Sequence, residues 1–501
     1  MVKVKIGENL DQTGDLGLEI IKKRVVKGVA VLTGRTFFLQ IVSFIAFFLF
    51  SIFLSSEQLG IFFIVSAVIN FLAYFSDIGL AAALIQKKEK LEEIELKTTF
   101  TIQQGIVLSL VVLVFIFTPL IKGWYSLDSQ AVYLLWALAI SLFLSSLKTI
   151  PSVLLERKLD FNKLVIPQLV ESLFYNLTAV LLAWQGFGII SFTAAVLVRG
   201  ISGLLLIYIL QPWKPGLAFS REALHKLLRF GLPYQLNTFI AVAKDDGMTI
   251  ILGGILGASG MGLLGWAQKW ANAPLRFFMD QIIRVTFPAF SRMQDDKIKL
   301  SFLVSKAIFF VCLFVFPSII GLVLLSPVLV SIIPKYEKWE PALLALYLIS
   351  INTAWAAVST PLTNMLNAIG KITLTFKLMV MWFFLTWLIL PILATFYGIN
   401  GVALGFALIG CSSIIAIILA YKYVKIDFVR SVGQPLLATI IMGITLVIAK
   451  IFLPETFLSV MILIVLGVIV YWLSIILLVG QAVLHDAKNI FYILKNQKSE
   501  D

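Results

Sequence analysis

The sequence predicts an all-α polytopic membrane protein with about fourteen transmembrane helices. Of its 501 residues, 60% are hydrophobic and only 13% are charged, which is more apolar surface than a soluble core needs. Apolar stretches of about 20 residues, the length that a helix needs to cross a bilayer, recur from end to end. Loops rich and poor in Lys and Arg alternate along the chain, as they do when successive loops lie on opposite sides of a membrane.

The spans are expected to be helices, because a helix satisfies its own backbone hydrogen bonds in lipid. Polar or basic connections separate them, and their ends are less certain in sequence than their centres. In order they are 29–54, 60–84, 99–121, 130–150, 162–184, 187–209, 232–256, 261–288, 303–332, 340–366, 373–396, 399–421, 433–451 and 456–480.

The distribution of basic residues predicts that both termini lie in the cytoplasm. The N-terminal segment, every second loop and the C-terminal tail together hold 29 Lys and Arg residues, among which we count Lys148 at the end of the fourth span. Basic loops are retained on the cytoplasmic side, so this asymmetry sets the orientation of the chain. Because both termini then lie on the same side, the number of spans must be even. The alternate loops, expected outside, hold only Lys122, Lys335, Lys338 and Lys450.

A weak internal repeat relates the start of the chain to its middle. The sequence LSSEQLG at 54–60 resembles LGASGMG at 256–262, an offset of 202 residues. The tripeptide that ends in Asp77 then matches the tripeptide that ends in Asp280, an offset of 203. An even number of spans separates the copies, which predicts a parallel repeat about an axis along the membrane normal.

The repeat and the loops predict two halves of six spans each, followed by two further spans. The longest cytoplasmic connection contains REALHKLLRF, a sequence typical of an amphipathic helix at a membrane interface. The expected segments are a cytoplasmic N-terminal segment at 1–27, an N-lobe at 28–210, a cytoplasmic linker with the amphipathic helix at 211–231, a C-lobe at 232–425, the last two spans at 426–482 and a cytoplasmic tail at 483–501.

The stretch from Gly262 to Arg284 has the pattern of a transmembrane helix, yet it carries four charged residues. Lys269, Arg276, Asp280 and Arg284 follow one another at steps of seven, four and four, which keeps them on one helix face. A charge at mid-bilayer costs about 2.5–3.5 kcal/mol or more, so this face should point into a wet interior. Pairing of Asp280 with both arginines is a structural alternative that stays open. It does not account for Lys269 and leaves the face net positive, which favours a cationic site for an anionic cargo.

Three further charged positions lie inside predicted spans. Arg35 is either an interfacial anchor at the cytoplasmic side or a ligand that binds phosphate through its planar guanidinium. Glu171 is the lone carboxylate of the fifth span. It either pairs with Arg199 of the sixth span, which would be structural, or binds a coupling ion.

Lys244, Asp245 and Asp246 are consecutive in the seventh span. Successive side chains on a helix point about 100° apart, so all three cannot face one cavity. Either they pair with a neighbouring helix, or an aspartate binds a coupling H⁺ or Na⁺. For Asp77 and Asp280, the repeat mates, structural pairing is the expected role.

Several chemistries are not indicated. The sequence has no G-x-x-x-x-G-K-[ST] loop, so ATP hydrolysis is not expected, and it has no H-E-x-x-H motif. His225 and His485 lie in cytoplasmic segments, and Cys312 and Cys411 lie in apolar runs. No metal site and no cofactor are therefore expected. The net charge of +13 is concentrated in loops on one side of a membrane, which accounts for it without nucleic acid.

The chain contains RVVKGVAVLTGRTFFLQIVSF, SSEQLG, FSDIGLAAALIQ, LLERKLDFNKLVIPQL, QPWKP, RFGLP, LGASGMGLLGWAQKWANAPL and FPAFSRMQDD. Together these sequences resemble the Wzx-type polysaccharide transporters, and more narrowly the branch that serves colanic and teichuronic acid export. Those proteins belong to the multidrug/oligosaccharidyl-lipid/polysaccharide exporter superfamily. The resemblance covers about residues 24–425.

The resemblance implies two six-helix lobes around a central cavity, plus two C-terminal helices, in the bacterial cytoplasmic membrane. It also implies flipping of undecaprenyl-pyrophosphate-linked oligosaccharide to the outer leaflet. In similar proteins the position of Lys269 is usually Arg, and cations of the first and eighth helices line the cavity, a pattern that Arg35 and Arg276 fit. Leu263 and Leu264 depart from the Tyr pair that similar proteins often carry.

We interpret the sequence as a secondary flippase and not an enzyme. The predicted pyrophosphate ligands are Arg35, Lys269, Arg276 and Arg284. The expected partners are the lipid-linked oligosaccharide and membrane lipids, with a polysaccharide polymerase and glycosyltransferases as further candidates. Three alternatives stay open. A lipid II flippase differs only in cargo, a multidrug antiporter of the same superfamily is disfavoured by the intramembrane cations, and a membrane polysaccharide polymerase or ligase is disfavoured by the short outer loops.

Overall fold

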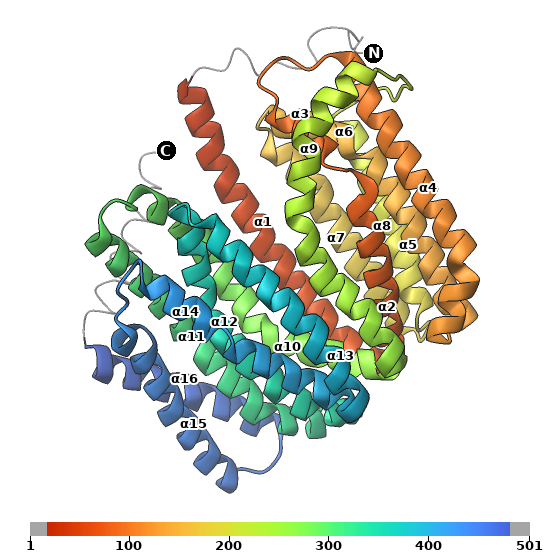
Figure 1. The fold of residues 1–501 in the computed structure, drawn as a ribbon. Coiled ribbons are helices and arrows are strands. Elements are labelled where there is room, and N and C mark those ends of the chain that lie inside the picture. Colours follow the sequence, from red (N-terminus) through yellow and green to blue (C-terminus); the bar gives the residue numbers. More distant parts are fainter. Residues whose placement is uncertain (1–17, 481–501) are drawn as a thin grey trace, which may run out of the picture. The chain divides into compact units, whose positions relative to one another are not determined.

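The computed structural model describes residues 18–480, with side chains from Gly34 onward except at 233–234, 236–238 and 285. Within these residues every regular element is a helix (Figure 1), which confirms the predicted all-α class. The chain divides into two compact units after Gly262. Residues 1–17 of the expected N-terminal segment at 1–27, and the expected tail at 483–501 with His485, lie outside the described residues.

The first unit holds nine helices and the start of a tenth. Its helices begin where the sequence supplies caps: Ser55 and Gln58 form a capping box at α2, and Asp128 and Asp160 accept backbone N–H groups at α5 and α7. The elements are α1 (Leu18–Phe53), α2 (Ser56–Ala73), α3 (Leu80–Gln86), α4 (Glu93–Tyr125), α5 (Ser129–Leu147), α6 (Thr149–Arg157), α7 (Phe161–Trp184), α8 (Ile190–Leu210), α9 (Arg221–Val242), a π-helical turn (Ala243–Gly247) and the first part of α10 (Met248–Arg292).

The second expected span, 60–84, is wrong at its end. Helix α2 stops at Ala73, a 3₁₀ turn follows, and α3 begins only at Leu80. Between them Gly79 has φ 76° and Ile78 has φ 44°, a left-handed conformation that breaks a helix. The carboxylate of Asp77 then accepts the backbone N–H of Ala81 at 3.1 Å and caps α3. The apolar run therefore contains two helices.

The piece expected to be an amphipathic interfacial helix is the first part of α9. Its apolar residues Leu224, Leu227 and Leu228 pack in the cluster around Leu80, Leu84 and Leu96. This part of the apolar face thus packs on protein of the same unit, and its position at a membrane interface stays a prediction. Hydrophobic periodicity predicts which face of a helix is apolar, but it does not predict whether protein or lipid contacts that face.

The second unit contains the rest of α10 and six further helices. Two core clusters hold it together, one around Val311, Phe316 and Leu362 and the other around Leu313, Met442 and Tyr471. The elements are α11 (Lys297–Ile332), a 3₁₀ turn (Glu337–Ala342), α12 (Leu343–Ala368), α13 (Ile372–Cys411), α14 (Ile414–Tyr421), a π-helical turn (Val429–Gly433), α15 (Gln434–Phe452) and α16 (Phe457–Val479).

Twelve segments of the described residues are long and apolar enough to cross a membrane. Two of them, Phe239–Arg292 and Ile372–Tyr421, have 54 and 50 residues, about twice the length that one crossing needs. Each is interrupted at a glycine with positive φ, Gly257 at 67° and Gly398 at 58°. After Gly398 the chain doubles back, because Gly401 and Gly405 pack on the leucines of residues 390–393. The count of fourteen stays a prediction that these breaks favour.

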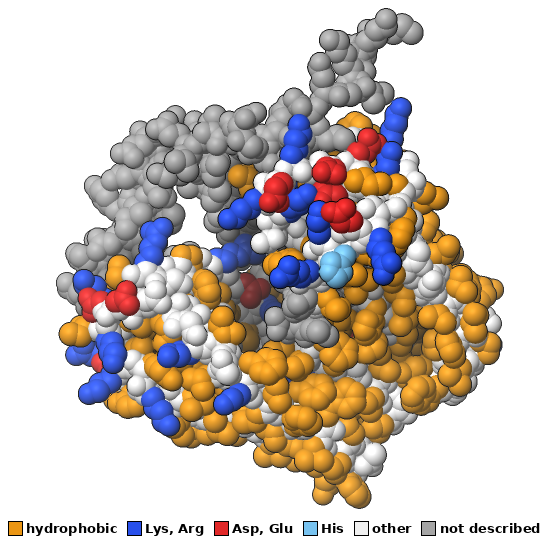
Figure 2. Space-filling view, turned by 45° about the horizontal axis from the view of Figure 1, so that its top comes forward, with side chains coloured by type: hydrophobic (Ala, Val, Ile, Leu, Met, Phe, Trp, Pro, Cys, Tyr) orange, Lys and Arg blue, Asp and Glu red, His pale blue; other side chains and the backbone are white. Residues whose placement is uncertain are grey.

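The surface has the character of a protein that is embedded in lipid. Large apolar side chains such as Ile209 of α8 and Leu477 of α16 are exposed to 71% and 83%. Figure 2 shows charged side chains gathered at one end of the visible face, with mostly hydrophobic side chains elsewhere. A soluble monomer rarely exposes apolar patches on this scale, so the chain is a multi-pass membrane protein.

The two copies of the internal repeat pack against each other inside the first unit. A Cβ on Gly60 would lie 1.7 Å from the Ala258 carbonyl oxygen, and a Cβ on Gly262 would lie 1.7 Å from the Ser56 carbonyl oxygen. The repeat offset of 202 residues relates Gly60 to Gly262 and Ser56 to Ala258. The two contacts are therefore equivalent, with the two copies exchanged. The Ser56 and Ser259 hydroxyls also meet at 3.2 Å. Such reciprocity is what a local two-fold axis between the copies would produce.

Candidate functional site

The charged face of α10 lies in the second unit. Lys269, Arg276 and Arg284 are exposed, whereas Ala267 and Ala271 on the other side of the helix are buried. Thr353 of α12 donates to the Asn272 side-chain oxygen at 3.0 Å and fixes the rotation of α10 next to this face. The helix thus leaves its cations accessible while its opposite side packs. That these cations line a cavity for the cargo stays a prediction.

Arg35 belongs to the first unit, where it extends from α1 to α7. One of its terminal guanidinium nitrogens donates to the side-chain oxygen of Gln168. The amide orients the guanidinium without neutralising it, because Gln is uncharged. Arg35 and the α10 cations belong to different units, and their convergence on one cavity stays a prediction.

Glu171 is buried in α7 between two cations. Its carboxylate lies 2.7 Å from the Lys148 ammonium and 3.9 Å from Nε of Arg199. The Arg199 guanidinium also lies 5.9 Å from the centre of the Tyr175 ring. On α8, a Cβ at Gly203 would come within 1.8 Å of the carboxylate, so the missing side chain makes room for it. The structure brings Glu171 and Arg199 together and adds Lys148, which sequence analysis placed in a loop.

This environment bears on the two roles that the sequence left open for Glu171. The carboxylate forms a buried ion pair with Lys148 and lies near Arg199, and these are the contacts that a structural role requires. The geometry favours the structural role.

The run Lys244 to Asp246 lies in the π-helical turn between α9 and α10. The Lys244 ammonium pairs with the Asp245 carboxylate at 2.5 Å, and Asp246 accepts a hydrogen bond from the side chain of Asn70 in α2. Single π-turns inside long helices are frequent at functional sites. The turn spaces the three side chains differently from an α-helix, which periodicity alone could not predict.

Two positioning residues, Gln168 and Lys148, were missed by the sequence analysis. Gln168 lies three residues before Glu171, on the same face of α7, and that spacing was a usable signal. An uncharged amide carries little cost in a membrane, so it does not stand out as a charge does. Among the described residues no three His, Cys, Asp or Glu side chains are grouped as a metal site would need.

Comparison with known proteins places these features in a family. Residues 49–343 match the family of polysaccharide biosynthesis proteins. The chain is 27% identical over 373 residues to the lipopolysaccharide biosynthesis protein WzxC of Escherichia coli strain K12, covering 74% of each chain. It is 26% identical over 245 residues to the succinoglycan biosynthesis transport protein ExoT of Rhizobium meliloti strain 1021, covering 49% of each.

A solved structure shares the fold. The lipid II flippase MurJ in its inward closed conformation is similar with a TM-score of 0.74 and 18% identity. The likeness covers 89% of this chain and 98% of that one. At this identity it shows the fold, which is that of an all-α membrane transporter.

Proposed function

This chain belongs to the family of polysaccharide biosynthesis proteins, and from that premise we propose that it is a secondary flippase for undecaprenyl-pyrophosphate-linked oligosaccharide. It moves the repeat unit across the bacterial cytoplasmic membrane by alternating access, with both termini in the cytoplasm. It catalyses no covalent step. The cargo supplies material for a surface polysaccharide.

The single observation that carries this proposal is the cationic face of α10. Lys269, Arg276 and Arg284 are exposed on one side of a long apolar helix whose other side is buried. A pyrophosphate that leaves water loses its hydration, and cations in a low-dielectric cavity replace that hydration with charge-assisted hydrogen bonds. The polyprenyl chain stays in lipid while the head group crosses.

Arg35, which lies in the first unit, is a further proposed ligand of the pyrophosphate. Its guanidinium offers two parallel N–H groups to a phosphate, and Gln168 holds it in one orientation. The proposed site of the coupling ion, H⁺ or Na⁺, is Asp246 in the π-helical turn, since Glu171 is paired with Lys148 and Asp245 with Lys244.

A lipid II flippase is the second candidate, because the MurJ likeness covers most of both chains. The same cationic site would serve either cargo, as both present a pyrophosphate. The family match and the relatives named for polysaccharide biosynthesis favour the oligosaccharide cargo.

Removing either cation of the α10 face should weaken cargo binding. A hydrogen bond to a charged group contributes about 1.5–3 kcal/mol, so Lys269→Ala or Arg276→Ala should reduce binding roughly ten- to a hundredfold. The measurement is accumulation of lipid-linked oligosaccharide on the cytoplasmic face of a flippase-deficient host that expresses each variant. Lys269→Arg should be tolerated, because similar proteins carry Arg there.

Arg292→Ala is the matched control, since Arg292 is the last residue of the same helix and is also exposed. It should complement like the wild type. Full complementation by both Lys269→Ala and Arg276→Ala, at normal expression, would show that the charged face is structural and would remove the basis of the proposal.

Gln168 gives a separate test of the Arg35 site. Gln168→Glu should keep the contact but neutralise the cation, and Gln168→Leu should keep the charge but lose the orientation. Both should raise the cargo concentration needed for half-maximal transport, and only the Glu variant should weaken the salt dependence of cargo binding, because it removes net charge. Equal salt dependence in the two variants would contradict a role through Arg35.

A further inference from the structure

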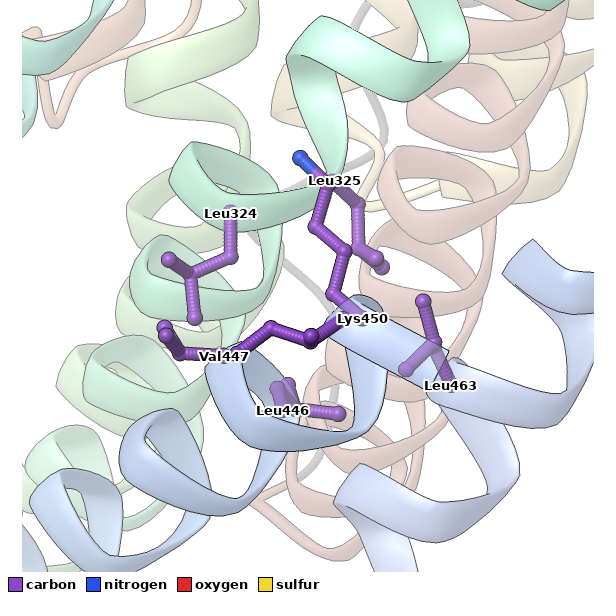
Figure 3. A pocket seen from close by; sticks show the side chains of 7 residues that line it. Leu324, Leu325, Leu446, Val447, Lys450 and Leu463 are labelled. Atoms are coloured by element: carbon purple, nitrogen blue, oxygen red, sulfur yellow. The ribbon is translucent and has the colours of Figure 1, made fainter. Parts of the chain in front are cut away.

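A cavity of about 420 Å³ lies between α11, α15 and α16 in the second unit, and Figure 3 shows the side chains that line it. Its walls are aliphatic, with Leu325 from α11, Leu446 and Val447 from α15 and Leu463 from α16. One polar side chain reaches it, that of Lys450. None of these residues belongs to the proposed cargo site.

The cavity opens toward the apolar surface of the protein. Leu325, Leu446 and Leu463 form its floor and are at least 93% buried, whereas Val447 and Ile451 at its rim are exposed to 49% and 76%. In a membrane this rim faces the hydrocarbon of the bilayer. A flexible aliphatic chain can enter such a cavity from the side and gain the contacts that an empty apolar space lacks.

Lys450 sets the chemistry at the end of the cavity. It lies in the last turn of α15, close to where the helix leaves the membrane, and in Figure 3 its side chain extends from α15 toward α11 beside Leu325. Among the described residues no carboxylate forms an ion pair with Lys450. The nearest acidic residue in the chain, Glu455, accepts a hydrogen bond from Ser331 at 2.9 Å. The ammonium is therefore available to an anion at the depth of lipid head groups.

We propose that this cavity binds one anionic glycerophospholipid, with an acyl chain against the leucines and the phosphate on Lys450. One cation matches the single charge of a phosphodiester. A pyrophosphate carries more charge and would call for several cations, as on α10. By the loop charges, the site lies in the outer leaflet.

The site lies where the last two helices attach to the rest of the unit. Helices α15 and α16 pack on α11 through the cluster around Leu313, Met442 and Tyr471. The cavity interrupts this packing at one end. A bound lipid would fill the gap and stabilise the attachment, as a ligand that binds only the folded state does.

The test uses the purified full chain in detergent, to which phosphatidylglycerol or the zwitterionic phosphatidylcholine is added. Native mass spectrometry counts retained lipids, and thermal unfolding gives the shift in Tm. The wild type should retain about one phosphatidylglycerol more tightly than phosphatidylcholine and gain more in Tm from it. Lys450→Gln should reduce this preference about tenfold, the effect of one charge-assisted hydrogen bond.

Two further variants distinguish lipid binding in this cavity from effects of surface charge on lipid retention. Val447→Trp places a large side chain in the cavity from its exposed rim and should abolish the tight lipid without unfolding the protein. Lys122→Gln is the matched control, since Lys122 is another lysine of the expected outer side, is exposed and does not line the cavity. It should leave the preference intact.

Three results would overturn the proposal. The first is equal retention of the two lipids by the wild type. The second is loss of the preference in Lys122→Gln as well, which would indicate an effect of surface charge. The third is displacement of phosphatidylglycerol by undecaprenyl phosphate at equal concentration, which would assign the cavity to the polyprenyl chain of the cargo.

Discussion

Replacing Gly60 with alanine should sharply lower both the Tm and the amount of folded protein. The added Cβ would lie 1.7 Å from the carbonyl oxygen of Ala258 and 2.7 Å from the backbone nitrogen of Gly262. These are backbone atoms of another helix, so they cannot rotate aside as a side chain could. Overpacking commonly costs about 1–3 kcal/mol, and an overlap with backbone should reach or exceed the top of that range.

The measurement is the Tm of detergent-purified protein together with its level in the membrane. Gly105→Ala is the matched control, because Gly105 lies in the middle of α4 and its added methyl group would meet no atom within 4 Å. That variant should be neutral or stabilising by up to about 1 kcal/mol, since alanine favours a helix. A wild-type Tm for Gly60→Ala would show that the two repeat copies do not touch as described.

Replacing Glu171 with glutamine should destabilise the protein by about 3–5 kcal/mol, the usual effect of breaking a buried ion pair. The carboxylate and its partner Lys148 are exposed by only 11% and 15%, so the ammonium would remain buried without its counter-ion. Replacing Glu171 and Lys148 together with methionine should recover most of the stability, because the one charge that remains, Arg199, is 56% exposed.

Glu93→Gln is the control for this prediction. Glu93 pairs with Lys97 at 2.7 Å, but its side chain is 62% exposed, and an exposed pair contributes about 0–1 kcal/mol. Unfolding in detergent and complementation of a flippase-deficient host should be measured together. If Glu171→Gln keeps normal stability but loses gradient-dependent transport, Glu171 is the coupling carboxylate after all.

Much of the fold could be predicted from the sequence, because lipid allows only a few solutions for a long apolar chain. The end of one span near 396 and the start of the next at 399 agree with the break at Gly398. The predicted end of the second span, at 84, was wrong, because hydropathy carries no information on the left-handed backbone conformation at Ile78 and Gly79. The division into units falls after Gly262, whereas the lobes were expected to divide at 231. That expectation stays a prediction.

The candidate site was predictable where charge made it conspicuous. Lys269 and Arg276 stand out because a cation in an apolar run is costly, and their shared exposed face follows from helical spacing. The partners that orient the site were not predictable in the same way. Gln168 and Asn70 are neutral, and Lys148 was counted among loop cations, so only the packing of α7 with its neighbours reveals their contacts.

The meeting of the two repeat copies at Gly60 and Gly262 has a consequence for how the sequence can vary. The backbones of α2 and α10 approach each other there because neither glycine carries a side chain, and one hydroxyl pair joins the two helices. In lipid, helices associate through close packing and not through burial of apolar surface, because lipid tails are as apolar as the side chains. The contact between the repeat copies therefore depends on these two positions, since any side chain at either glycine would hold the helices apart.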